Sequence, residues 1–156
     1  MANKDLRDWI SDLEANGQLQ VVSGADREEE IGAIVDIYMR QMTNPAVMFD
    51  NIPGYPKDFR VLANILTSVE PIDKSEAELV DYWRKYMKDQ PTHAPIEVNG
   101  GPILDNVFEG ADIDITKIPT PKWHEHDGGY FIGTACMVIM KDPDSGWINY
   151  GAYRVQ

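Results

Sequence analysis

The sequence has little cysteine, little positive charge and no long apolar run. Cys136 is the single cysteine in 156 residues, which excludes an intramolecular disulfide and fits a reducing compartment. Acidic residues number 26 against 14 lysines and arginines, and the net charge of -12 opposes binding to phosphate backbones or anionic lipid. The apolar stretches fall short of a membrane span, and the opening MANKDLRDWI lacks a signal-peptide pattern. We therefore expect a soluble cytoplasmic protein that binds neither nucleic acid nor membrane.

A chain of this length can fold without covalent cross-links. At 156 residues it suits one ordinary domain, which can bury roughly 70% of its unfolded surface. Cys136 lies inside the apolar run GTACMVIM, where a cysteine is most often a small buried hydrophobic residue. We expect that role for it rather than the role of a nucleophile.

Apolar residues recur at helical spacing in two segments near the start of the chain. In the first segment the stripe runs from Leu6 to Leu13, and Gly17 follows as a stop signal. The second segment is REEEIGAIVDIYMRQM, whose stripe begins at Ile31 and ends at Met42. Its acidic first turn suits the positive end of a helix dipole. We expect these glutamates to be solvated and to have no functional role.

Three short runs of β-forming residues accompany these helices. They are QLQVV, PAVMFD and RVLANIL, at residues 18–22, 45–50 and 60–66. The last two are separated by NIPGYPKDF, which has the composition of a loop, so they are predicted to be strands of one sheet. A third helix is predicted at 76–88, because Ser75 and Glu78 form a capping-box pattern ahead of an apolar stripe.

Glycine and proline become frequent after Ile96, and no further helical periodicity follows. The segment GADIDITKIPTPKWHEHDGG resembles a connection between domains. We therefore expect an α+β fold with a small α/β amino-terminal domain at residues 1–115. A connecting segment at 116–130 follows, and the first strands of a second domain occupy 131–156.

The last part of the chain has the pattern of an antiparallel hairpin. YFIGTACMVIM and WINYGAYRV flank KDPDSG, whose composition is that of a tight reversal. Two strands alone are marginally stable in water, because a hairpin needs further strands or a helix to cover its apolar face. The hairpin is therefore expected to pack against partners outside residues 1–130.

Asn149 and Arg154 are candidate binding residues on the second strand of this hairpin. Their odd spacing places them on opposite faces of a regular strand. Gly151 lies between them, and a glycine within a strand often marks a bulge. We expect a bulge at or beside Gly151 that brings both side chains to one side. An amide oxygen suits a hard metal ion, and a guanidinium suits a carboxylate or phosphate.

WHEHDGG is the densest group of metal-capable side chains. In an extended segment His124 and His126 would point to the same side, and Glu125 and Asp127 to the other, so a metal would need a distant ligand such as His93. A small metal-binding β protein is one interpretation of this motif. Local hydrogen bonds in a loop are the alternative, and we favour them.

The chain resembles a known family along almost its whole length. The segments that carry the resemblance are DLRDWISDLEANGQL, EIGAI, PAVMFDNIPGYP, RVLANI and KIPTPKWHEHDGGYFIGTACMVIMKDPDSGWINYGAYRVQ. They resemble the amino-terminal third of the UbiD-type decarboxylases, which depend on prenylated FMN. The resemblance implies a small α/β domain followed by the opening strands of a split β-barrel that binds the flavin.

The resemblance also implies roles for particular residues. Asn149 would be a ligand of the Mn2+ or other divalent ion that ties the flavin phosphate to the protein. The backbone carbonyl of Trp147 would contact K+. Arg154 would be catalytic, orienting the substrate carboxylate within a network with two glutamates. The residues implied to surround prenylated FMN are Asn149, Tyr150, Gly151, Ala152, Tyr153, Arg154 and Thr134.

A complete site needs more than this chain carries, because the other metal ligands and both glutamates of the family lie further along. We therefore expect a piece of a longer carboxy-lyase that acts reversibly on a small aromatic or α,β-unsaturated acid. A flavin prenyltransferase would supply its cofactor, and a homo-oligomer would be its assembly. The alternative is a non-catalytic partner or regulatory subunit that kept the amino-terminal fold.

Overall fold

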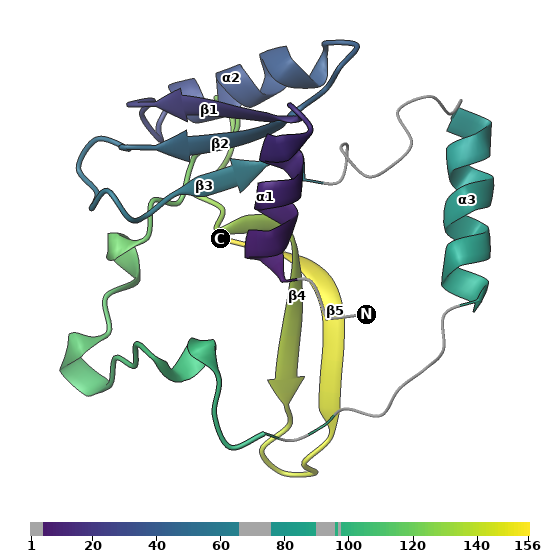
Figure 1. Ribbon diagram of the computed structural model, residues 1–156. Helices are drawn as coiled ribbons and strands as arrows, with labels where there is room; N and C mark the ends of the chain where they lie inside the picture. Colours follow the sequence, from purple (N-terminus) through teal and green to yellow (C-terminus); the bar gives the residue numbers. More distant parts are fainter. Residues whose placement is uncertain (1–4, 66–75, 90–95, 97) are drawn as a thin grey trace. The chain divides into compact units, whose positions relative to one another are not determined.

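The computed structural model describes residues 5–65, 76–89, 96 and 98–156 (Figure 1). The chain forms two compact units, one made of Met1–Val69 with Thr116–Gln156 and the other of Glu70–Ile115. The first unit therefore holds the amino-terminal sheet, the connecting segment and the terminal hairpin together. The domain boundaries expected from the sequence stay predictions.

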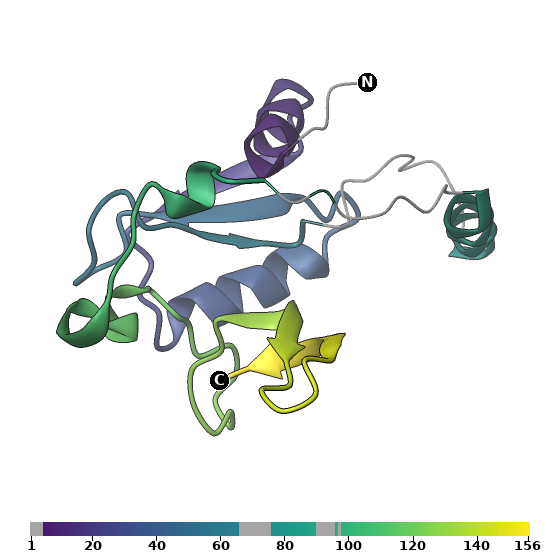
Figure 2. The same cartoon turned by 90° about the horizontal axis from the view of Figure 1, so that it is seen from below.

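The first unit is built on a three-stranded sheet in the order β1-β2-β3. Strand β1 (Leu19–Ser23) pairs in parallel with β2 (Ala46–Asp50), and β3 (Val61–Ala63) pairs antiparallel with β2. The crossover between the two parallel strands is made by α2 (Glu30–Met39), as parallel pairing requires. Four of the five residues of the central strand β2 are buried, because it has a neighbour on each edge and a helix on each face (Figure 2).

Helix α1 (Leu6–Ala15) covers the face of the sheet opposite to α2 (Figure 2). It begins with a capping box in which the Asp5 carboxylate accepts the backbone N–H groups of Arg7 and Asp8 at 2.8 and 3.0 Å. It ends where Gly17 adopts a φ of 66°, a conformation that glycine adopts at little cost. The helix predicted from the sequence is confirmed.

The core lies between α2 and the sheet. Its members are buried apolar residues of both elements and of the loops beside them: Ala25, Ile31, Val35, Val47, Phe49, Ile52 and Ala63. Ile31 of the predicted apolar stripe is fully buried, but the prediction for Met42 is wrong, because that residue is 99% exposed. The helix ends at Met39, so Met42 lies beyond the last turn that faces the core.

The terminal hairpin is confirmed. Strand β4 (Gly133–Lys141) pairs antiparallel with β5 (Ile148–Val155). The expected bulge at Gly151 is wrong, because Gly151 pairs in regular register with Val138. The register shift lies instead on β4 between Gly133 and Cys136, where two residues face the single position of Arg154.

The second unit contains α3 (Glu76–Asp89), which confirms the third predicted helix, and the short 3-10 helices η1 (Pro102–Leu104) and η2 (Gly110–Asp112). The Ser75 half of the predicted capping box lies outside the described residues. Three aromatic rings of α3, those of Tyr82, Trp83 and Tyr86, pack on one another with centroids 5.7 to 6.2 Å apart. Among the described helices, none has the length and apolar character needed to cross a bilayer.

We predict that Asp5→Ala speeds amide hydrogen exchange in the first turn of α1 at neutral pH. The N–H groups of Asp8 and Arg7 hold the pKa of the Asp5 carboxyl below its usual 3.8, so the ionised form stabilises the helix start. This stabilisation is present above pH 3.8 and is lost as the pH falls through the lowered pKa of Asp5. Exchange measured by mass spectrometry should therefore differ between variant and parent at pH 7 and converge in strong acid. Equal exchange at pH 7 would show that the cap does not hold the helix end.

Candidate functional site

A hollow of about 640 Å3 opens within the first unit, between α2, β3, the connecting segment and the start of the hairpin. Val35 and Met39 of α2 and Val61 of β3 give it apolar walls. Its polar and charged lining comprises Asp36, Arg60, Asn64, Thr120, His124, Asp127, Thr134 and Arg154. A concave apolar site with a few polar groups is the usual form of a small-molecule site.

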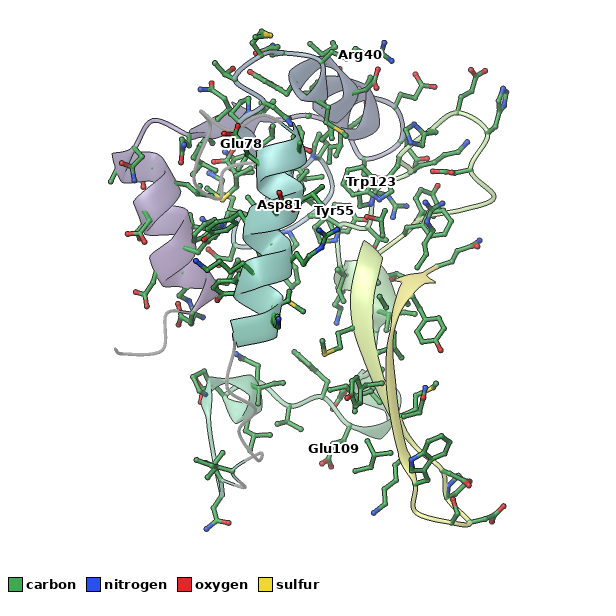
Figure 3. All side chains as sticks on the ribbon, turned by 90° about the vertical axis from the view of Figure 1, so that its right-hand side faces the viewer. Arg40, Tyr55, Glu78, Asp81, Glu109 and Trp123 are labelled. Carbon is green, nitrogen blue, oxygen red and sulfur yellow. The ribbon has the colours of Figure 1, made fainter. Side chains whose placement is uncertain are left out.

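The connecting segment forms one wall because it is fixed to α2 by backbone contacts. A Cβ built on Gly32 would overlap the carbonyl oxygen of Trp123, so only glycine allows this approach. The N–H of Lys122 donates to the carbonyl of Arg27 over 2.9 Å. Side chains of Trp123 and Tyr55 pack against the core cluster from outside (Figure 3).

A cluster around Arg27 fixes the same segment at the start of α2. The guanidinium carbon of Arg27 lies 4.1 Å from the ring centroid of Tyr130 and 5.5 Å from that of Tyr55. The Tyr130 hydroxyl donates to the Glu28 carboxylate at 2.8 Å, and this hydrogen bond raises the pKa of Tyr130. The cluster joins residues about 100 positions apart in the chain, so the segment is anchored on both sides of Trp123.

The HEHD motif forms a turn. The N–H of His124 donates to the Asp127 carboxylate, and the N–H of Asp127 donates to the His124 carbonyl, both over 3.0 Å. This confirms the interpretation of local hydrogen bonds. In the described part of the chain no three His, Cys, Asp or Glu side chains form a metal-holding group. His93, the distant ligand considered for this motif, lies outside the described residues.

Arg154 and Thr134 come together in the hollow, across the register shift of the hairpin. The guanidinium carbon of Arg154 lies 5.0 Å from the ring centroid of Phe131. Among the described residues no carboxylate pairs with Arg154. Its hydrogen-bond donors are therefore available to a ligand.

Asn149 is not among the residues that line the hollow. It pairs with Met140 and lies five positions before Arg154 on an unbroken β5, and this odd spacing puts the two on opposite faces. Trp147 and Tyr150 are 72% and 71% exposed, and the Trp147 carbonyl accepts the N–H of Asp142 over 2.8 Å. The roles expected for these residues stay predictions.

Three further residues of β5 that were expected to bind the cofactor lie between Asn149 and Arg154. Gly151 lies under the ring of Tyr153, whose nearest atom would be 2.8 Å from an added Cβ. Tyr153 is half exposed, and Ala152 pairs with Met137. Cys136 is half-buried rather than fully buried, because the hairpin face on which it lies is partly open.

Sequence reasoning missed Arg60 and Asp36, which line the hollow, and Phe131, which contacts Arg154. Asp36 is already paired, because Arg40 donates to both of its oxygens at 2.9 and 3.2 Å. Arg60 begins the run RVLANIL that predicted β3, so a cation just before a strand was the available signal. Phe131 had no signal, since its partner Arg154 is 23 residues away and meets it only through the hairpin.

Two family models together match most of the chain. The model described as the 3-octaprenyl-4-hydroxybenzoate carboxy-lyase N-terminal domain matches residues 10–84. The model described as the Rift-related domain of the same carboxy-lyase matches residues 95–156.

Curated relatives match this chain with part of their length. The pyrrole-2-carboxylic acid decarboxylase of Pseudomonas aeruginosa is 30% identical over 97% of this chain and 33% of its own. A phenolic acid decarboxylase of Streptomyces sp. is 29% identical over 100% of this chain and 35% of its own. The chain thus spans about a third of the length of these relatives.

Solved structures share the fold. Vanillic acid decarboxylase of Sedimentibacter hydroxybenzoicus, in open form, superposes with a TM-score of 0.82 at 28% identity, over 100% of this chain and 36% of that one. An evolved dimeric form of the UbiD-class enzyme HmfF of Pelotomaculum thermopropionicum, solved with prFMN, gives a TM-score of 0.70 at 24% identity. It covers 99% of this chain and 36% of the other, and it supports the fold alone. The predicted α+β class is confirmed, with small sheets and an open hairpin.

We predict that Gly32→Ala destabilises the first unit, although alanine favours a helix interior over glycine. The added methyl group would meet the Trp123 carbonyl, and overpacking of this kind costs about 1–3 kcal/mol. Chemical denaturation followed by tryptophan fluorescence measures the free energy of unfolding. Gly128→Ala is the matched control, because nothing lies within 4 Å of the added Cβ. A Gly32→Ala protein at least as stable as the parent would contradict the close approach.

Proposed function

We propose that this chain, which belongs to the UbiD family of carboxy-lyases, forms the amino-terminal part of a prenylated-FMN-dependent enzyme. The reaction would be reversible removal of CO2 from an aromatic or α,β-unsaturated acid. Support comes from the curated relatives, which are decarboxylases of pyrrole-2-carboxylic and phenolic acids. The observation that carries the proposal is the hollow in which Arg154, without a carboxylate partner among the described residues, faces apolar walls.

Arg154 would bind the carboxylate of the acid. A guanidinium offers a planar pair of donors that matches a carboxylate, and it stays charged at all working pH values. The apolar side chains of α2 and β3 line the same hollow as Arg154. They suit the flat apolar body of an aromatic acid.

Loss of CO2 leaves a carbanion that needs an electron sink, and prenylated FMN would supply that chemistry when bound. The described residues fit such a group. Thr134 adds a hydroxyl beside Arg154, and β5 presents Tyr150 and Tyr153 as half-exposed or exposed rings. We propose that Thr134 and residues 149–154, Gly151 and Ala152 among them, bind the cofactor. A flavin prenyltransferase would be the supplier.

Asn149 would be one ligand of the divalent ion that holds the cofactor phosphate. Its side chain has no hydrogen-bond partner among the described residues, and an amide oxygen suits Mn2+. The other ligands would come from outside the described residues, since these contain no three-residue metal group. The Trp147 carbonyl would contact K+ through its second lone pair, because the first accepts the Asp142 N–H.

The exposed side chains of the hairpin suggest how the rest of the enzyme would assemble on this chain. Met137 and Ile139 of β4 and Trp147 and Tyr150 beside or on β5 are all more than half exposed. Large contiguous apolar surface usually marks an interaction site. We propose that further strands of a split β-barrel cover it, and that the whole enzyme is a homo-oligomer.

We predict that Arg154→Ala in the full-length enzyme lowers turnover of the acid by roughly 100-fold or more. Loss of a charged donor aimed at the reacting group removes stabilisation that water cannot replace. Bound-cofactor absorbance should stay close to that of the parent. Assays of CO2 release, read beside the flavin spectrum, measure both quantities.

Arg84→Ala is the matched control for this variant. Arg84 lies on α3 and pairs with Asp81 over 3.2 Å, so its loss should leave turnover unchanged. Parallel loss of absorbance and turnover in Arg154→Ala would assign that residue to cofactor binding instead. Unchanged turnover would contradict its role, and a full-length protein that releases no CO2 from any acid would favour a non-catalytic partner subunit.

We predict that Asn149→Ala lowers the Mn2+ content of the purified full-length enzyme, because the ion would lose a hard oxygen ligand. His124→Ala is the control, since the backbone of His124 and not its ring makes the contacts of the HEHD turn. Elemental analysis of both variants measures the bound ion. Metal loss in His124→Ala with retention in Asn149→Ala would move the site to the HEHD turn.

A further inference from the structure

Phe131 is the one aromatic residue that touches Arg154 among the described residues. Its side chain is 9% exposed, and the guanidinium carbon of Arg154 lies 5.0 Å from its ring centroid. A guanidinium within about 6 Å of an aromatic ring face is attracted by the ring quadrupole. A guanidinium that stacks on a ring through its face keeps the donors at its edge free for a ligand.

The position of Phe131 is fixed through its backbone. Its N–H donates to the carbonyl of Pro121 over 3.0 Å, and its carbonyl accepts the indole N–H of Trp123 over 3.3 Å. The Trp123 backbone in turn rests directly against Gly32 of α2. A continuous set of contacts therefore runs from the amino-terminal helix layer to the ring of Phe131.

The same segment holds the residues that flank Arg154. The N–H of Ile132 donates to the carbonyl of Val155 over 3.0 Å, and the side-chain amide of Gln156 donates to the carbonyl of Gly128 over 3.2 Å. Arg154 is thus supported by the ring beneath its guanidinium and by two bonds to its chain neighbours. Its place is set by the connecting segment as much as by the pairing of β4 with β5.

From these contacts we propose that Phe131 is a positioning residue for Arg154. It acts as a platform, anchored to α2 through Trp123, that holds the guanidinium in the orientation in which its donors face the hollow. The amino-terminal domain then contributes to catalysis by aligning a residue of the hairpin. This inference rests on the proposed function for its kinetic consequence, but its structural content stands on the contacts alone.

Two variants of the full-length holoenzyme test the platform. Phe131→Leu keeps an apolar side chain but removes the ring, and Phe131→Tyr keeps the ring. Loss of a cation–π contact is expected to lower kcat/KM of Phe131→Leu by about 2- to 30-fold, with cofactor content unchanged. Phe131→Tyr should stay near the parent. Combined with Arg154→Ala, Phe131→Leu should add no further loss, because its effect passes through Arg154.

Crystal structures of the same variants give a readout independent of turnover. The Arg154 guanidinium should leave its place over residue 131 in Phe131→Leu and keep it in Phe131→Tyr. Phe131→Met, which retains volume without a ring, replaces Phe131→Leu should that variant fail to fold. An unmoved guanidinium in the ringless variants, or equal kinetics of Phe131→Leu and Phe131→Tyr, would overturn the proposal. Absence of CO2 release from the parent would contradict the proposed function. The crystal structures would still show whether Phe131 holds the Arg154 guanidinium in place.

Discussion

The approach of the Trp123 backbone to Gly32 is the contact on which the rest of the first unit depends. A side chain at position 32 would displace the connecting segment, because its Cβ would overlap the Trp123 carbonyl. The segment then carries Phe131 and the start of β4, so one residue without a side chain determines where a distant strand begins. The hollow exists because two parts of the chain, separated by about 90 positions, are held at backbone contact distance.

Four of the six arginines of this acidic chain are paired with carboxylates, whereas Arg60 and Arg154, which both line the hollow, have no ion pair among the described residues. Arg7, Arg27, Arg40 and Arg84 each have a carboxylate within 4.0 Å, as expected where acids outnumber bases. Arg154 contacts an aromatic ring instead, which stabilises the cation without occupying its donors. Acidic residues outnumber basic ones in this chain, and the net charge is -12. Even so, no carboxylate lies within ion-pair distance of the Arg154 guanidinium in the part of the chain described.

Local patterns in the sequence predicted the elements better than their relations. The stripe from Leu6 to Leu13 and the Asp-Pro-Asp-Ser-Gly reversal predicted α1 and the hairpin, because both depend on neighbours in the chain. The prediction that Met42 faces the core was wrong, because periodicity does not mark the residue at which a helix ends.

Features that depend on contacts between distant residues were not predictable from local patterns. Gly151 was a reasonable candidate for a bulge, but register is decided by both strands together, and the shift formed on β4. The contact between Phe131 and Arg154 leaves no periodic trace for the same reason. The hairpin also affects how the chain folds. It has exposed apolar side chains on both of its faces, and such surfaces favour association between chains. Until further strands cover these side chains, self-association through the hairpin competes with folding.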